Sequence, residues 1–176
     1  MKELNLDDVI RKVPDFPKPG ILFYDITSIF LNPSAFQWIV DKMAEIYKDK
    51  HIDALLAVES RGFIFASAFS YKLGIPVVLA RKAGKLPGEV INESYSLEYG
   101  TAALEVHKDD LKAGSNILII DDLVATGGTL AACAKLVERL GGKVAGFFGV
   151  IGLPFLDYHK TLDGYEVTTL INYDSE

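Results

Sequence analysis

The stretch of sequence that decides the fold is Ile117-Leu118-Ile119-Ile120-Asp121-Asp122-Leu123-Val124-Ala125-Thr126-Gly127-Gly128-Thr129. Four apolar residues that favour β-structure run into two adjacent acidic residues, which predicts a buried strand with carboxylates at its end. A loop of small residues follows and leads into an apolar helical pattern. In such a strand–turn–helix unit, the backbone N–H groups of the turn and the N-terminus of the helix both attract an anion. Because the carboxylates repel a phosphate, we expect them to bind hydroxyl groups, a metal ion or both, and the stretch predicts a site for a sugar phosphate.

Predicted strands and helices alternate on both sides of this stretch. Apolar runs predict strands over residues 54–58, 75–79, 144–151 and 165–171, and helical spacing predicts helices over about 33–49 and 63–73 and from the turn to Leu140. This alternation predicts the α/β class, with a mostly parallel, twisted sheet flanked by helices. Ligands bind beyond the carboxyl ends of the strands in such sheets. Glu59, Arg81 and Asp121 each follow a strand end, so we expect them to meet at one rim of the sheet.

Two segments depart from the alternation. At the N-terminus, residues 4–12 are expected to form a short helix, residues 13–20 to be irregular because of their three prolines, and residues 21–26 to form a strand. Residues 81–107 form the second departure: a basic, turn-rich segment followed by a polar-aromatic one, which is typical of a long hairpin. Such a long excursion between core elements is more often functional than decorative.

Composition narrows the classes of protein that fit. The chain has 176 residues and a net charge of −6, with 49% hydrophobic residues, which suits one soluble globular domain. The absence of a Lys/Arg run argues against nucleic acid as a partner. No signal-peptide pattern and no apolar run of about 18 residues occur, so we expect no membrane association and a cytoplasmic location. The single cysteine, Cys133, falls in an apolar helical pattern and is expected in the core.

The two common phosphate-binding motifs are missing from the sequence. It contains neither the Gly-x-x-x-x-Gly-Lys-Ser/Thr motif of P-loop nucleotidases nor a Gly-x-Gly-x-x-Gly fingerprint after a strand. A second candidate anion site is Glu59-Ser60-Arg61-Gly62, where backbone amides and one guanidinium group lie on a strand-to-helix turn. The alternative is a structural arginine, with Arg61 paired to Glu59 or Glu93.

The stretch at residues 117–129 also resembles the phosphoribosyl-diphosphate (PRPP) signature of the type I phosphoribosyltransferases. The resemblance implies the fold of that family, with a small N-terminal hood at residues 1–30 and a flexible catalytic loop and hairpin at residues 81–107, in one domain spanning residues 1–176. It implies that Asp121 and Asp122 hold the ribose hydroxyls and that the following turn wraps the 5′-phosphate through Ala125, Thr126, Gly127, Gly128 and Thr129. It also makes the turn at Glu59, Ser60 and Arg61 the pyrophosphate loop, with a cis peptide between Glu59 and Ser60.

Within that family the chain is similar to the members that use adenine, from about Pro14 to Leu153. The motifs that carry this likeness are FPKPGILF at residues 16–23, ESRGF at 59–63, RK at 81–82 with GKLPG at 84–88, and YSLEYG at 95–100. The resemblance implies transfer of the 5-phosphoribosyl group from PRPP to adenine, giving AMP and pyrophosphate, in a homodimer with Mg²⁺ held mainly by PRPP. Members that use another base, such as xanthine, hypoxanthine or orotate, and regulators that only sense PRPP are the alternatives.

The same resemblance assigns roles to individual residues. The adenine pocket would contain Leu22, Phe23, Tyr24 and Leu153, and pyrophosphate would be met by Arg81, Lys82 and Lys85, Arg81 across a dimer interface. Catalysis would fall to Arg61, to Glu98 as the general base and to Tyr99 as a cover over the site. Two positions depart from the family pattern, because Tyr24 stands where an arginine is usual and Gly152 where a glutamate is usual.

Overall fold

The structure, a computed structural model, describes residues 4–96 and 101–175 of the chain. Within these residues the main sheet has the strand order β10-β9-β7-β3-β4-β6-β5, with the short β8 paired to β9. The first five strands of this order are mutually parallel, which confirms the predicted mostly parallel sheet. Their bounds, with that of β8, are β3 (Ala54–Val58), β4 (Val77–Lys82), β7 (Asn116–Ile120), β8 (Leu123–Val124), β9 (Lys143–Gly152) and β10 (Val167–Asn172).

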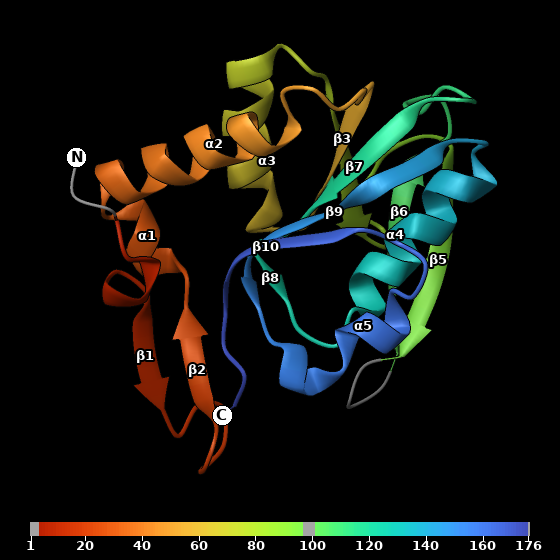
Figure 1. Ribbon diagram of the computed structural model, residues 1–176. Helices are drawn as coiled ribbons and strands as arrows, with labels where there is room; N and C mark the ends of the chain where they lie inside the picture. Colours follow the sequence, from red (N-terminus) through yellow and green to blue (C-terminus); the bar gives the residue numbers. More distant parts are fainter. Residues whose placement is uncertain (1–3, 97–100, 176) are drawn as a thin grey trace.

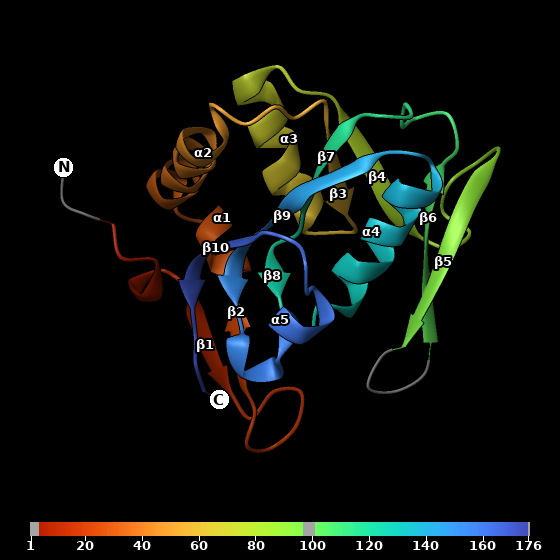
Figure 2. The ribbon, with the colours of Figure 1, turned by 45° about the vertical axis from the view of Figure 1, so that its right-hand side comes forward.

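The predicted hairpin closes one edge of the sheet. Strands β5 (Val90–Ser96) and β6 (Thr101–His107) pair antiparallel, and β6 joins β4 in an antiparallel register that places Arg81 opposite Glu105. Figure 2 shows this hairpin at the side of the sheet remote from β10. The excursion between β4 and β7 therefore extends the sheet by two antiparallel strands.

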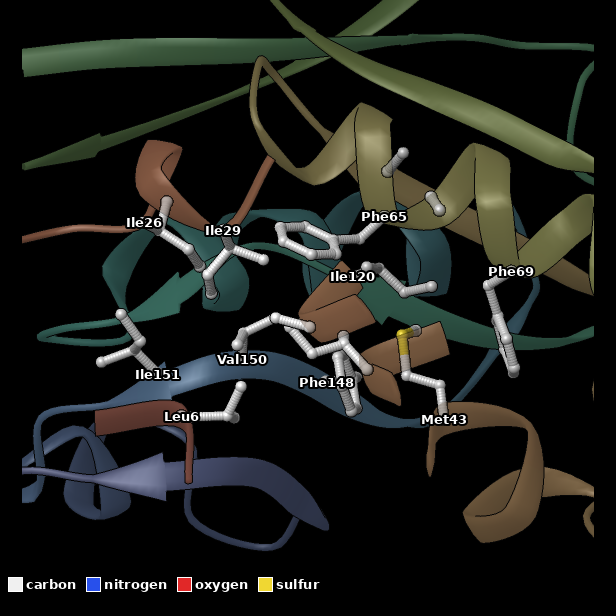
Figure 3. Close-up of a cluster of buried hydrophobic side chains, with 14 of the residues drawn as sticks. Leu6, Ile26, Ile29, Met43, Phe65, Phe69, Ile120, Phe148, Val150 and Ile151 are labelled. Carbon is white, nitrogen blue, oxygen red and sulfur yellow. The ribbon is translucent and has the colours of Figure 1, made fainter. Parts of the chain in front are cut away.

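Helices cover both faces of the sheet (Figure 1). The short α1 (Thr27–Phe30) with α2 (Pro33–Tyr47) and α3 (Gly62–Leu73) covers one face, and α4 (Gly128–Arg139) with the short α5 (Tyr158–Thr161) covers the other. Because strand side chains alternate between faces, β3 contributes Leu55 and Ala57 to the first core and Leu56 to the second. Figure 3 shows the first core, which includes Phe65 of α3 and Phe148 of β9.

The local signals at helix ends behave as the sequence predicts. The Asn32 side chain accepts a hydrogen bond from the backbone N–H of Ala35 at 3.1 Å and so caps α2, with Pro33 at its first position. Gly74 ends α3 with a φ of +69°, a left-handed conformation that glycine adopts without steric cost. Cys133 is fully buried in α4, as expected.

The strand expected over residues 21–26 is confirmed as β2, whereas the helix expected over 4–12 is wrong beyond residue 8, and residues 13–14 are not irregular. Residues 6–8 form only a 3₁₀ helix, η1 (Leu6–Asp8), and β1 (Arg11–Pro14) then pairs antiparallel with β2 (Leu22–Asp25). The apolar residues Leu6, Val9 and Ile10 have the spacing of a helix. The residues that follow them form a strand instead, because they pair with β2. Pro14 is tolerated because it lies at the end of a strand in a two-stranded sheet.

The C-terminal end of the chain packs against this N-terminal hairpin, and both views place the two side by side (Figures 1 and 2). The ring of Tyr173 stacks on Tyr24 with centroids 3.7 Å apart, and its hydroxyl donates to Asp7 at 2.8 Å. The connection from β9 passes through a second 3₁₀ helix, η2 (Pro154–Leu156). Among residues 4–96 and 101–175, no helix has the length and apolarity needed to cross a bilayer.

Candidate active site

The parallel strands bring the predicted charged residues together at their carboxyl ends. A pocket of about 240 Å³ lies there, between the ends of β3 and β7 and the start of α4. It is lined by Val58, Glu59, Ser60, Arg61, Lys82, Tyr95, Asp121, Asp122 and Thr129. Residues from four separate parts of the chain therefore share one pocket, which is the convergence that the topology predicts.

Arg61 and Asp122 form the central ion pair of this pocket. The Arg61 Nε donates to Asp122 Oδ2 at 2.5 Å, and Asp122 is only 4% exposed. Burial alone would lower the pKa of Arg61, but the Asp122 carboxylate next to it raises that pKa above its ordinary value. The predicted alternative partners of Arg61, Glu59 and Glu93, are therefore wrong, because the guanidinium group points to the acidic pair.

Asp121 has a different environment from its neighbour. Burial at the end of β7, and then the negative charge of Asp122, raise the pKa of Asp121 well above its ordinary value. Its Oδ1 accepts only the backbone N–H of Asp122, at 2.9 Å, among the hydrogen bonds of the described residues. Asp121 is thus the carboxylate of the pair that Arg61 does not bind directly, and it lines both the main pocket and the neighbouring one.

That neighbouring pocket, of about 70 Å³, is the expected phosphate turn. Its lining runs along the chain from Leu123 to Leu130, together with Asp121. Gly127 precedes α4 with a φ of +82°, and no side chain caps the first turn of this helix. The first backbone N–H groups of α4 are therefore left for an anion, and the macrodipole of a 12-residue helix favours one there.

Gly62 lets the turn at residues 59–62 approach the end of β7 closely, and a methyl group at this position should push the two apart. A Cβ at Gly62 would lie 2.7 Å from the Ile120 carbonyl oxygen and 3.2 Å from the Asp121 Cα. Gly62→Ala is expected to lower the free energy of unfolding by about 1–3 kcal/mol and to weaken binding at the pocket. Chemical denaturation measures the first effect, and Ser67→Ala, an exposed position of the same helix, is the matched control. An unfolding free energy equal to that of the unmodified chain would contradict the close packing.

Glu59 positions cationic residues in this structure. Its carboxylate accepts the Lys82 backbone N–H at 2.8 Å and the Arg81 guanidinium at 3.3 Å. Although burial raises the pKa of Glu59, these two hydrogen bonds bring it below the ordinary value. The peptide bond between Glu59 and Ser60 is cis, as the resemblance implies. Of the three basic residues expected near pyrophosphate, Lys82 lines the main pocket, whereas Arg81 and Lys85 do not.

The residues expected to bind a base lie on β2 and, for Leu153, between β9 and η2. Leu22 and Phe23 are half-buried on β2, where the ring of Phe16 meets Phe23 edge-on at 5.0 Å. Leu153 is 9% exposed, and its N–H donates to the carbonyl of Val124 beside the phosphate turn. The Tyr24 ring is buried against Tyr173, and its hydroxyl donates to the carbonyl of Ser175 at 3.4 Å.

The departure at Gly152 has a packing explanation. A Cβ at this position would lie 2.2 Å from Asn172 Oδ1, 2.9 Å from Thr169 Cγ2 and 3.0 Å from the Tyr158 hydroxyl. Asn172 pairs with Gly152 across β9 and β10, and its Oδ1 accepts a hydrogen bond from the Thr169 hydroxyl at 2.8 Å. The Asn172 side chain therefore occupies the space that a side chain at residue 152 needs.

This packing predicts an energetic coupling between Gly152 and Asn172. Gly152→Ala is expected to cost about 1–3 kcal/mol of unfolding free energy, because the new methyl group overlaps the amide oxygen. The cost should fall when Asn172→Ala is present, and a double-mutant cycle by urea denaturation measures the difference. Strictly additive costs would show that Asn172 is not the group that excludes a side chain here.

Two expected catalytic residues, Glu98 and Tyr99, lie outside the described residues. Two pocket residues were given no role from the sequence: Val58 at the end of β3 and Tyr95 on β5. Tyr95 belongs to the YSLEYG motif, but the sequence does not show that Tyr95 shares a pocket with Asp121 and Asp122. The hairpin supplies that position, because β5 lies next to β6 at the sheet edge.

The match to known proteins is extensive. Residues 25–162 match the family model described as a phosphoribosyl transferase domain. The chain is 59% identical over 176 residues to an adenine phosphoribosyltransferase from Treponema denticola, covering all of this chain and 93% of that protein.

Solved structures give the same result for the fold. The adenine phosphoribosyltransferase of Thermoanaerobacter pseudethanolicus superposes with a TM-score of 0.91 at 46% identity, over 95% of this chain and 97% of that one. The Saccharomyces cerevisiae enzyme, complexed with an iminoaltritol bisphosphate and adenine, gives 0.88 at 40% identity, over 94% and 96% of the two chains. These matches run along nearly the whole length of the chain, and the chain therefore belongs to the adenine phosphoribosyltransferase family.

Proposed function

We propose that this protein transfers the 5-phosphoribosyl group of PRPP to adenine, giving AMP and pyrophosphate as a step of purine salvage. One observation carries the proposal: the acidic pair Asp121 and Asp122 shares a pocket with Arg61 and with Thr129 of the phosphate turn. This arrangement matches the order of groups along PRPP. The turn before α4 binds the 5′-phosphate, the acidic residues bind the ribose hydroxyls, and the Arg61 turn lies where pyrophosphate leaves.

The charge of the site fits the charge that develops in the reaction. Adenine N9 attacks the anomeric carbon as its bond to pyrophosphate breaks, so negative charge grows on the leaving group and positive charge on the ribose ring. Arg61 and Lys82 lie in the pocket before reaction and stabilise the departing pyrophosphate. The carboxylates of Asp121 and Asp122 offset the positive charge on the ring.

The base must lose a proton from N9 as it attacks. Glu98 is the proposed general base that takes this proton, and Tyr99 the residue that excludes water from PRPP. Leu22 and Phe23 on one side and Leu153 on the other are proposed to enclose adenine. Backbone atoms of residue 24 read its polar edge, because the Tyr24 ring is committed to Tyr173.

Mg²⁺ is the proposed cofactor, held mainly by PRPP, and Asp121 in the main pocket offers an oxygen donor of the kind that this ion prefers. Among residues 4–96 and 101–175, no cluster of three or more His, Cys, Asp or Glu side chains could hold a metal. Asp121, which Arg61 does not bind, is the protein group placed to share such an ion. When bound, Mg²⁺ supplies charge neutralisation for the pyrophosphate oxygens.

Three further features are proposed from the family likeness. We expect residues 1–176 to fold as one domain, the protein to act as a homodimer, and the enzyme to be cytoplasmic. Light scattering of the purified protein tests the dimer. In such a dimer Arg81 would reach the pyrophosphate of the neighbouring subunit.

A base-specificity profile tests the proposed function. The purified protein is mixed with PRPP, Mg²⁺ and adenine, hypoxanthine, xanthine or orotate in turn, and nucleotide formation is followed by chromatography. AMP formed from adenine, with the other bases at least about a hundredfold slower, is the expected result. Faster turnover of another base would assign the protein to that base. Binding of PRPP without turnover of any base would instead identify a PRPP-sensing regulator.

A further inference from the structure

One buried carboxylate holds the loop at residues 83–88, which follows the basic residues Arg81 and Lys82 and contains Lys85. Glu105 lies in β6 and is only 4% exposed. Its carboxylate accepts hydrogen bonds from three consecutive backbone N–H groups: Gly84 at 3.0 Å, Lys85 at 2.8 Å and Leu86 at 2.7 Å. A buried carboxylate costs free energy unless such donors compensate it. Three N–H groups of one loop that converge on a single carboxylate therefore indicate a specific structural contact.

The contact is made by an ionised group. The hydrogen bonds from Gly84 and then Leu86 outweigh burial and hold the pKa of Glu105 below its ordinary value. A charged acceptor makes each of these bonds shorter and stronger than a neutral acceptor would. The loop conformation thus depends on the negative charge of Glu105 as well as on its shape.

The same loop is tied to Arg81. The Lys85 carbonyl accepts a hydrogen bond from the Arg81 guanidinium at 3.2 Å, while the other end of that guanidinium pairs with Glu59 at 3.3 Å. Arg81 also lies directly opposite Glu105 in the pairing of β4 with β6. The buried Arg81 Nε is the one buried side-chain donor or acceptor without a hydrogen-bond partner in the described part of the chain. Fixing the loop therefore also fixes the orientation of the Arg81 side chain.

Resting on the proposed phosphoribosyl transfer, we propose that Glu105 is a positioning residue that holds the 83–88 loop so that Arg81 and Lys85 can meet pyrophosphate. Glu105 itself does not touch the substrate in this scheme. The three hydrogen bonds to Glu105 fix the backbone conformation of the loop. That conformation in turn orients the side chains of Arg81 and Lys85. The effect should appear in the binding of PRPP and pyrophosphate and should be small in the binding of adenine.

The test compares Glu105→Gln with Glu89→Gln, an exposed glutamate at the start of the same hairpin that pairs with Lys108. The amide nitrogen that Glu105→Gln introduces cannot accept a hydrogen bond, so at least one of the three N–H groups loses its acceptor. The KM for PRPP and the inhibition constant of pyrophosphate should rise roughly ten- to hundredfold, with the KM for adenine nearly unchanged. Hydrogen exchange at the Gly84, Lys85 and Leu86 amides should accelerate in Glu105→Gln alone.

Glu105→Ala adds a rescue experiment. The alanine variant lacks a CH₂–COO⁻ group, which has the size of acetate, so added acetate should lower its raised KM for PRPP and leave Glu89→Gln unaffected. An unchanged KM for PRPP in Glu105→Gln, or KM values for PRPP and adenine that rise together in proportion to lost stability, would overturn the positioning role.

If the protein does not carry out phosphoribosyl transfer, the experiments give a different set of results. In that case the unmodified protein forms no AMP, and calorimetric titration with pyrophosphate decides about Glu105. Weaker pyrophosphate binding in Glu105→Gln than in Glu89→Gln supports the positioning role without turnover. Equal binding, or no pyrophosphate binding by the unmodified protein, refutes it.

Discussion

The Asp121→Asn/Asp122→Asn double variant is expected to lose PRPP binding, with a dissociation constant more than about a hundredfold higher than that of the unmodified protein. A hydrogen bond to a charged group contributes about 1.5–3 kcal/mol, and the variant replaces both carboxyl groups that are proposed to accept hydrogen bonds from the ribose hydroxyls. It also removes the partner of Arg61, whose Nε lies 2.5 Å from Asp122 Oδ2. Calorimetric titration with PRPP and Mg²⁺ measures the effect. Asp163→Asn, at an exposed position, is the matched control, and retained PRPP affinity in the double variant would refute the ribose role.

The two single variants, Asp121→Asn and Asp122→Asn, should change the free energy of unfolding in opposite directions. The raised pKa of Asp121 means that the folded protein disfavours its charged form. Its ionisation therefore destabilises the fold at pH values above the raised pKa, and this penalty disappears as pH falls to the ordinary value near 3.8. Asp121→Asn should thus raise the free energy of unfolding near neutral pH and lose this advantage in acid. Asp122→Asn should lower stability, because it leaves Arg61 without its carboxylate. Urea denaturation at several pH values measures both, and a pH-independent difference would contradict the assignment to Asp121.

The Glu98→Gln variant is expected to lower kcat by a factor on the order of 10²–10⁴, the usual contribution of a general base. Glutamine keeps the shape of the side chain but cannot take the N9 proton of adenine. PRPP affinity should change little, because this proton transfer takes place on the base. Steady-state kinetics with both substrates varied measures the two effects, and Glu89→Gln is the control within the hairpin.

The pH profile gives a second readout for Glu98. The acidic limb of kcat/KM for adenine reports the protonation of the base in the free enzyme, so it should disappear in Glu98→Gln. A near-normal rate, or an unaltered acidic limb, would remove Glu98 as the base and leave solvent or another residue to accept the proton.

Much of the fold could be predicted because its signals are local. The continuous apolar run at residues 54–58 became a strand with both faces covered, and Asn32 and Gly74 marked the ends of helices by their own hydrogen bonds and conformations. Strand–helix alternation then placed Glu59 and Asp121 at one rim of the sheet. The failure at residues 11–14 has the opposite cause, since that strand exists through its pairing with β2.

The partners of the charged residues could not be predicted in this way. The sequence by itself determined the α/β class, the two strand-to-helix turns and the acidic pair beside one of them, because spacing, glycines and apolar runs act over a few neighbouring residues. Only the tertiary structure decided that Arg61 pairs with Asp122, that Glu59 holds Arg81, that Asn172 fills the space beside Gly152, and that Glu105 closes the 83–88 loop. Each of these contacts joins residues 19 or more positions apart. Charge pairing and close packing depend on distances of a few ångströms, and those distances exist only after the strands have paired and the helices have packed.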